Sequence, residues 1–67
     1  MNVIKFKSND KIVREIVVIG WDISYEDNSI TIWVFNRIIK GKFNSIDFST
    51  DGYKTVVTID GFVEENN

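Results

Sequence analysis

Residues 32–43, IWVFNRIIKGKF, place two large aromatic side chains, Trp33 and Phe35, close to three cationic ones. Exposed aromatic rings can stack on nucleic-acid bases, while lysine and arginine neutralise phosphates. The residues that could do this chemistry are Trp33, Phe35, Arg37, Lys40 and Lys42. The net charge of −2 gives the chain no overall attraction to a phosphate backbone. Binding of single-stranded nucleic acid is therefore one candidate function, and it would depend on a local basic surface.

The same stretch resembles the first RNA-binding strand region of cold-shock domains. The matching pattern begins with an aromatic residue and continues with Phe35, Asn36, Lys40, Gly41 and Phe43. The pattern departs from that family at Lys42 and Asn44, and the chain has no second aromatic-rich strand with a histidine. The resemblance implies an OB-like fold that binds single-stranded nucleic acid, but these departures leave it short of a family assignment.

The side chains needed for catalysis are scarce. The chain has no cysteine and no histidine, which excludes disulfides, thiolate nucleophiles, histidine-assisted catalysis and the usual zinc sites. The acidic residues Asp22, Glu26 and Asp27 could form a carboxylate cluster, but the rest of a calcium loop is missing. Asp27 also lies in a predicted turn, where aspartate is favoured for its own hydrogen bonds. We expect no enzyme, no metal site and no cofactor.

The composition favours strands over helices. Isoleucine and valine supply 19 of the 67 residues, whereas leucine, alanine, proline and glutamine are absent. Such usage is typical of AT-rich genomes, which suggests a bacteriophage of a low-GC host and thus a viral protein. No segment approaches the ~20 apolar residues of a membrane helix. We expect a cytoplasmic protein.

Period-two alternation of apolar and polar residues runs through most of the chain, and three polar clusters interrupt it. These clusters predict hairpin turns centred on Asn9-Asp10, Asp27-Asn28 and Asp51-Gly52. Asp-Gly suits a type I′ turn, which needs positive φ at both central residues. This turn pairs Phe48 with Thr55 and Ile46 with Val57 on the core face.

The turn at Asp27-Asn28 predicts which side chains of the next hairpin face the core. The core pairs are Tyr25 with Ile30, Ile23 with Ile32, and Trp21 with Val34. The opposite face then carries Trp33 and Phe35, which point outward. Gly20 falls opposite Phe35 and marks a bend in a long strand.

The segment 11–19 allows two interpretations. Six of its nine residues are β-branched, which favours a strand, but the pattern from Ser8 to Gly20 also fits a capped helix. As a strand, it places Val17 and Ile19 on the core side with Ile16 and Val18 outside. Glu15 then points inward, which requires either a β-bulge or a position at the sheet rim.

These patterns predict an all-β fold, a small five-stranded antiparallel meander that closes as an SH3-like or OB-like barrel. The expected strands are 2–7, 11–25, 29–38, 42–49 and 53–60, and a helix at 11–19 would make the fold α+β instead. One domain is expected over 1–62, followed by a short acidic tail over 63–67.

A non-catalytic protein-binding module is the leading functional interpretation. Contiguous apolar patches rimmed by charge usually mark protein interfaces. The predicted partner-binding residues are Ile16, Val18, Asp22, Trp33, Phe35, Arg37 and Ile39. Pairing of two copies through this face predicts a homodimer. The alternative is that Trp33 and Phe35 simply pack inside the domain.

Overall fold

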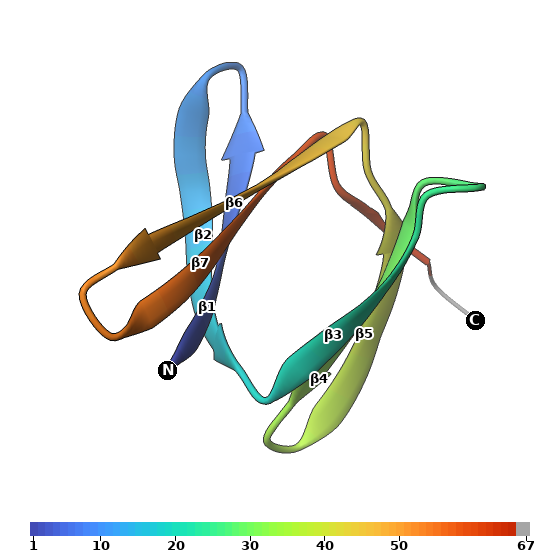
Figure 1. Cartoon of the computed structure of the whole chain (residues 1–67). Coiled ribbons are helices and arrows are strands. Elements are labelled where there is room, and N and C mark those ends of the chain that lie inside the picture. The colour runs from blue at the N-terminus through green and yellow to red at the C-terminus, as the bar shows by residue number, and fades with distance from the viewer. Residues whose placement is uncertain (66–67) are drawn as a thin grey trace.

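A computed structural model describes residues 1–65, which form an all-β protein (Figure 1). Its eight strands are β1 (Asn2–Ser8), β2 (Lys11–Val18), β3 (Gly20–Ser24), β4 (Ser29–Val34), β5 (Arg37–Lys42), β6 (Ser45–Asp51), β7 (Lys54–Asp60) and β8 (Val63–Glu64). The all-β class predicted from the sequence is confirmed. Within the described residues, no helix is long and apolar enough to cross a membrane.

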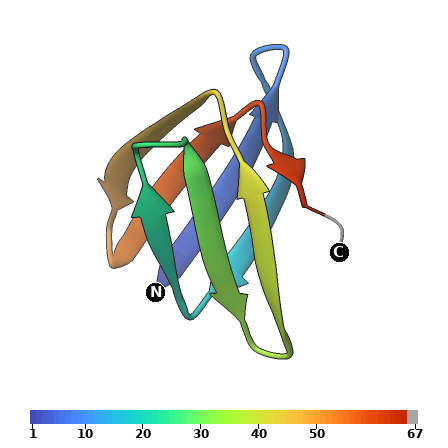
Figure 2. The ribbon, with the colours of Figure 1, turned by 90° about the vertical axis from the view of Figure 1, so that its right-hand side faces the viewer.

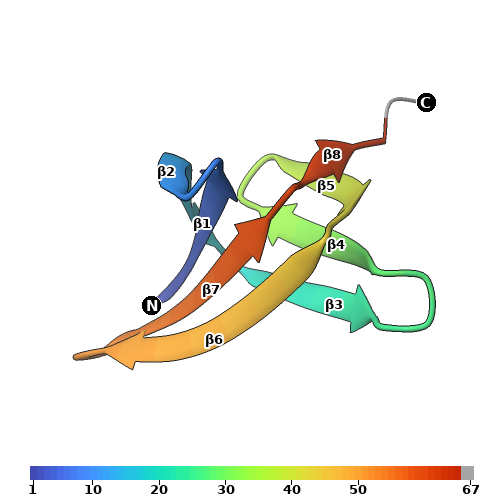
Figure 3. The ribbon, with the colours of Figure 1, turned by 90° about the horizontal axis from the view of Figure 1, so that it is seen from above.

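The strands form two four-stranded sheets. Sheet A has the order β2-β1-β7-β6 and sheet B the order β3-β4-β5-β8. The two sheets face each other as layers whose strands cross, as Figures 2 and 3 show. Strands β1 and β7 pair in parallel, so sheet A is mixed and the predicted antiparallel meander is wrong. Among residues 1–65 no closed barrel is formed, because each sheet keeps two free edges.

Two of the five predicted strands are divided. The strand expected at 11–25 bends between Val18 and Gly20 and becomes β2 and β3, close to the predicted bend. The strand expected at 29–38 ends at Val34, and a two-residue turn leads into β5. Part of the predicted tail, 63–64, forms β8 against β5. Asn66 and Asn67, the end of that tail, lie outside the described residues.

The segment 11–18 is a strand, so the helical alternative is wrong. The register shifts after Phe6, which pairs with Arg14, whereas Lys7 pairs with Ile12. Val13 is therefore the extra residue of a β-bulge, one of the two solutions that the inward position of Glu15 required. The bulge reverses the faces, so the sequence-based assignment of Val17 to the core was wrong.

The turns use different central residues from those predicted at two of the three hairpins. Asn9 and Asp10 both have positive φ, as in a type I′ turn. The last hairpin turns at 52–53 instead, because Asp51 pairs with Lys54 and positive φ occurs at Gly52. The loop of the second hairpin covers 25–28.

Both shifted turns move the pairing by two residues, which preserves the faces but changes the partners. Trp21 pairs with Ile32, and Gly20 with Trp33. Phe48 pairs with Val57 and Ile46 with Ile59. Tyr25 lies in the loop and is 65% exposed, so its predicted core position is wrong.

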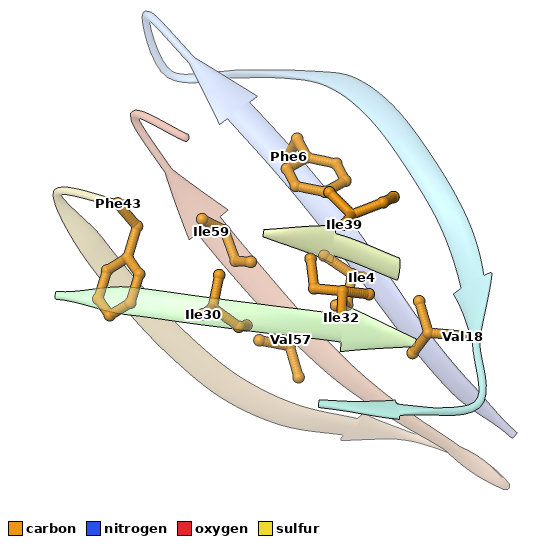
Figure 4. Packing of buried hydrophobic residues seen from close by; sticks show 9 residues of the cluster. All are labelled: Ile4, Phe6, Val18, Ile30, Ile32, Ile39, Phe43, Val57 and Ile59. Atoms are coloured by element: carbon orange, nitrogen blue, oxygen red, sulfur yellow. The ribbon is translucent and has the colours of Figure 1, made fainter. Parts of the chain in front are cut away.

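The core lies between the two sheets (Figure 4). Its side chains are almost all β-branched, which suits packing on pleated surfaces. Sheet A contributes Ile4, Phe6, Val18, Val57 and Ile59, sheet B contributes Ile30, Ile32 and Ile39, and Phe43 lies in the connection between β5 and β6. Val3 and Val56 are also buried but neighbour each other on the outer face of sheet A.

Candidate functional site

The β4–β5 hairpin presents three apolar side chains to solvent. Phe35 is 96% exposed in the turn, Ile38 is 56% exposed and Trp33 is 37% exposed. Trp33 and Ile38 are directly paired, so they lie on the same outer face of sheet B. We call Trp33, Phe35 and Ile38 the hairpin patch. It is supported by a well-packed strand pair, since Ile32 and Ile39 on the other face are buried.

The predicted partner-binding residues are divided between the surface and the core. Asp22, Trp33, Phe35 and Arg37 are exposed, as an interface requires. Val18 is 6% and Ile39 1% exposed, and Ile16 packs against the same core, so these three cannot form an open patch. The bulge at Val13 and the turn at 35–36 reverse the faces on which the sequence placed them.

The residues predicted to bind nucleic acid are also separated. Lys40 pairs with Thr31 and Lys42 with Ser29, so both lysines share the outer face of sheet B with Trp33. Arg37 instead pairs with Val34, on the side of the sheet that faces the core. Its guanidinium Nη1 lies 3.6 Å from Glu64 Oε2, which offsets its charge. The outer face thus holds one ring and two cations, together with Asp22.

A hollow of about 360 Å³ separates β2 from the β4–β5 hairpin. It is lined by Arg14, Ile16, Val17, Val34, Phe35, Asn36, Arg37 and Ile39. Val17 is 63% exposed at one wall, and Phe35 from the hairpin patch forms part of the other. Figure 1 shows this hairpin beside the corner where β2 passes into β3. The hairpin patch and β2 therefore border one depression, which both apolar and polar side chains line.

A second hollow, of about 310 Å³, continues along β2 toward the end of the chain. Its lining includes Val13 and Arg14 from β2, and Phe62 and Glu64 from the other side. Arg14 Cζ lies 5.8 Å from the ring centroid of Phe6, a cation–π distance. The Phe6 ring in turn packs on Phe62 with centroids 5.0 Å apart. Arg14 lines both hollows and stands between them.

Among residues 1–65, the acidic residues Asp22, Glu26 and Asp27 do not form a metal-binding cluster. Within residues 1–65 no group of three or more potential ligands is close enough to hold a metal ion. Ser29 Oγ donates a hydrogen bond to Asp27 Oδ1 at 2.7 Å, which lowers the pKa of that carboxyl, with a smaller contribution from Ser24. Asp27 therefore has the local turn role predicted for it.

Sequence reasoning missed Val17 and Ile38 as candidate site residues. Val17 was assigned to the core because a bulge was only one of two explanations for the inward Glu15, and the pattern did not place it at Val13. Ile38 could have been found, since Asn36 is a common turn residue between two apolar runs. A turn there would have placed Ile38 opposite Trp33.

Comparisons of this chain with protein-family models, with curated proteins and with solved structures find no match.

Proposed function

We propose that this protein is a non-catalytic module that binds another protein through the hairpin patch and the adjoining hollow beside β2. The observation that carries the proposal is Phe35, a phenylalanine that is 96% exposed at the edge of this depression. A side chain in this position adds almost nothing to the core. It gains burial only when a partner covers it.

The surroundings of Phe35 support this proposal. Trp33 and Ile38 extend the apolar surface on one side, and Val17 extends it across the hollow. Aromatic residues and arginine are the most common energetic anchors of protein interfaces. Arg14 and Arg37 lie at the margin of the same hollow. An apolar centre with a charged rim is the usual anatomy of such an interface.

The proposal can be tested with two matched variants of the full chain. Phe35 and Tyr53 are both aromatic residues of hairpin turns, and Tyr53 is 100% exposed. Both Phe35→Ser and Tyr53→Ser should fold normally. A protein retained by the wild-type chain from a lysate of the source organism should be lost with Phe35→Ser and kept with Tyr53→Ser. Equal loss with both variants, or with neither, would contradict the proposal.

Single-stranded nucleic acid remains the second candidate partner. Its support is that Trp33, Lys40 and Lys42 share the outer face of sheet B. Titration with labelled oligonucleotides at two salt concentrations tests it, because a phosphate-driven complex weakens steeply as salt rises. Absence of binding at low salt rules it out.

A second copy of the chain is also a candidate partner, and the predicted homodimer would now use the hairpin patch without Ile16 and Val18. Sedimentation of the wild type and of Trp33→Lys tests this, since the charge should leave only a monomer. The SH3-like or OB-like architecture also stays a proposal, supported by the bend from β2 into β3. An origin in a bacteriophage and a cytoplasmic location rest on composition alone.

A further inference from the structure

Strand β2 is a free edge of sheet A. It pairs with β1 on one side and has no strand on the other. Within residues 1–65, the backbone hydrogen bonds outside the strand ladders do not involve residues 11–18 either. Alternate N–H and C=O groups of β2 therefore lack a backbone partner, and such an edge is a template for another strand. The bulge at Val13 limits the regular part of this template to residues 14–18.

The two hollows lie along this free edge. One is lined by Val13 and Arg14, and the other by Arg14, Ile16 and Val17. A chain paired with β2 would therefore place its inward side chains in these hollows. Peptides that add a strand to a sheet bind in this manner, through main-chain hydrogen bonds together with pockets for alternate side chains.

The charge around the hollows is opposite in sign to that of the whole protein. Lys7, Arg14 and Arg37 line them, and Glu64 is their one anionic lining residue. Glu64 is already close to Arg37. Among the described residues, Arg14 has no carboxylate within ion-pair distance. A protein with a net charge of −2 thus presents a cationic groove, which complements an acidic segment.

We propose that the partner enters as an extended segment of alternating apolar and acidic residues that adds a strand to residues 14–18 of β2. An acidic side chain of this segment faces Arg14. Its apolar side chains lie on the opposite face of the added strand, beside Val17. This inference rests on the proposed protein-binding function and names the class of partner that the site takes.

A second copy of this chain fits the edge less well. Antiparallel pairing of β2 with itself about a two-fold axis sets the central residue opposite its own copy. Centring on Arg14 or on Glu15 therefore sets like charges opposite each other, which is destabilising. Centring on Ile16 sets both charged residues opposite valines. An acidic partner strand satisfies Arg14 without these conflicts.

The test uses the full chain and two ten-residue peptides, one of alternating valine and glutamate and one of alternating valine and lysine. The glutamate peptide should slow amide hydrogen exchange at alternate residues within 14–18, and the lysine peptide should not. Arg14→Glu should weaken binding of the glutamate peptide about tenfold. The same variant should bind the lysine peptide more tightly than the wild type does.

Lys40→Glu is the matched control, since it makes the same charge change on the outer face of sheet B. It should change the affinity by less than about twofold. If the glutamate peptide protects no β2 amide at millimolar concentration, strand addition is wrong. A partner that still depends on Phe35 would then leave the protein-binding function standing. Protection of these amides by an oligothymidine instead of the peptide would also overturn the inference.

Discussion

The two edges of sheet A have similar lengths but very different side chains. Strand β6 carries Ser45, Asp47, Ser49 and Asp51 on its outer face. Strand β2 carries Ile12, Val13 and Val17, each more than half exposed. Acidic side chains on a free edge oppose pairing with another chain, whereas apolar ones favour it. The β6 edge is thus acidic, whereas the β2 edge combines exposed apolar side chains with the charged Lys11, Arg14 and Glu15.

The two sides of the sandwich differ in the same way. On the β6 side, Phe48 packs against Trp21 of sheet B with ring centroids 6.3 Å apart. This contact joins the two sheets directly. On the β2 side, two hollows separate the sheets, and the side chain between them is a long cation, Arg14. One side therefore joins the two sheets, and the other is the side that we propose for binding.

The largest expected effect comes from the strands between the two edges. Ile4 is fully buried on β1, next to Val57 on β7. Ile4→Ala should cost about 2 to 5 kcal/mol of unfolding free energy, because it leaves a cavity in the core. A domain of this size could lose most of its stability. Urea denaturation measures the loss, and Val13→Ala at the exposed β2 edge, with a much smaller loss, is the control.

The next effect concerns β8, whose Glu64 lines the second hollow, of about 310 Å³. A Cβ added at Gly41 would meet the backbone oxygen of Val63 and would lie 2.6 Å from two ring atoms of Phe62. Gly41→Ala should therefore cost about 1 to 3 kcal/mol through overpacking. It should also loosen β8 and speed exchange of the Glu65 amide, which donates to Lys40 O. Unchanged exchange there would contradict this mechanism.

A direct comparison of the edges uses one row of residues across sheet A. Val17, Val3, Val56 and Ser49 are successive neighbours, so Val17 on β2 and Ser49 on β6 occupy equivalent edge positions. Val17→Asp should weaken partner binding about tenfold, or about 1.4 kcal/mol, because it removes an apolar contact and places a negative charge beside the acidic segment. Ser49→Asp should leave binding unchanged. Calorimetry with the glutamate peptide measures both, and equal losses would mean that the β2 edge has no special role.

Local patterns predicted the all-β class, the turn at Asn9-Asp10 and the exposure of Trp33 and Phe35. They could not predict the parallel pairing of β1 with β7, because these strands are far apart in sequence and no turn sets their register. The inward position of Glu15 indicated a bulge only as one of two explanations, and the place of the bulge at Val13 could not be predicted, since a bulge leaves no gap in an apolar run. That single extra residue exchanged the faces of Ile16 and Val17, and with them the predicted interface.

The predicted registers of two hairpins were wrong for a simpler physical reason. Asp51-Gly52 and Gly52-Tyr53 both place glycine at a position that can take positive φ, and the choice shifts the register by two residues. A shift of two keeps each side chain on its face, which is why Trp33 was correctly placed outside. It still changes neighbours, so Gly20 faces Trp33 instead of Phe35.

The smallest expected effect concerns the corner that joins the β2 edge to sheet B. Gly20 has no positive φ, and a Cβ added there would meet nothing within 4 Å. The Trp33 ring therefore does not cover this position, although the two residues are paired. Gly20→Ala should raise stability by about 0.5 to 1 kcal/mol, because alanine restricts the unfolded chain. Thermal denaturation measures the gain, and peptide binding at β2 should not change. A loss of stability would mean that Gly20 has a backbone conformation, at the bend from β2 into β3, that alanine does not adopt.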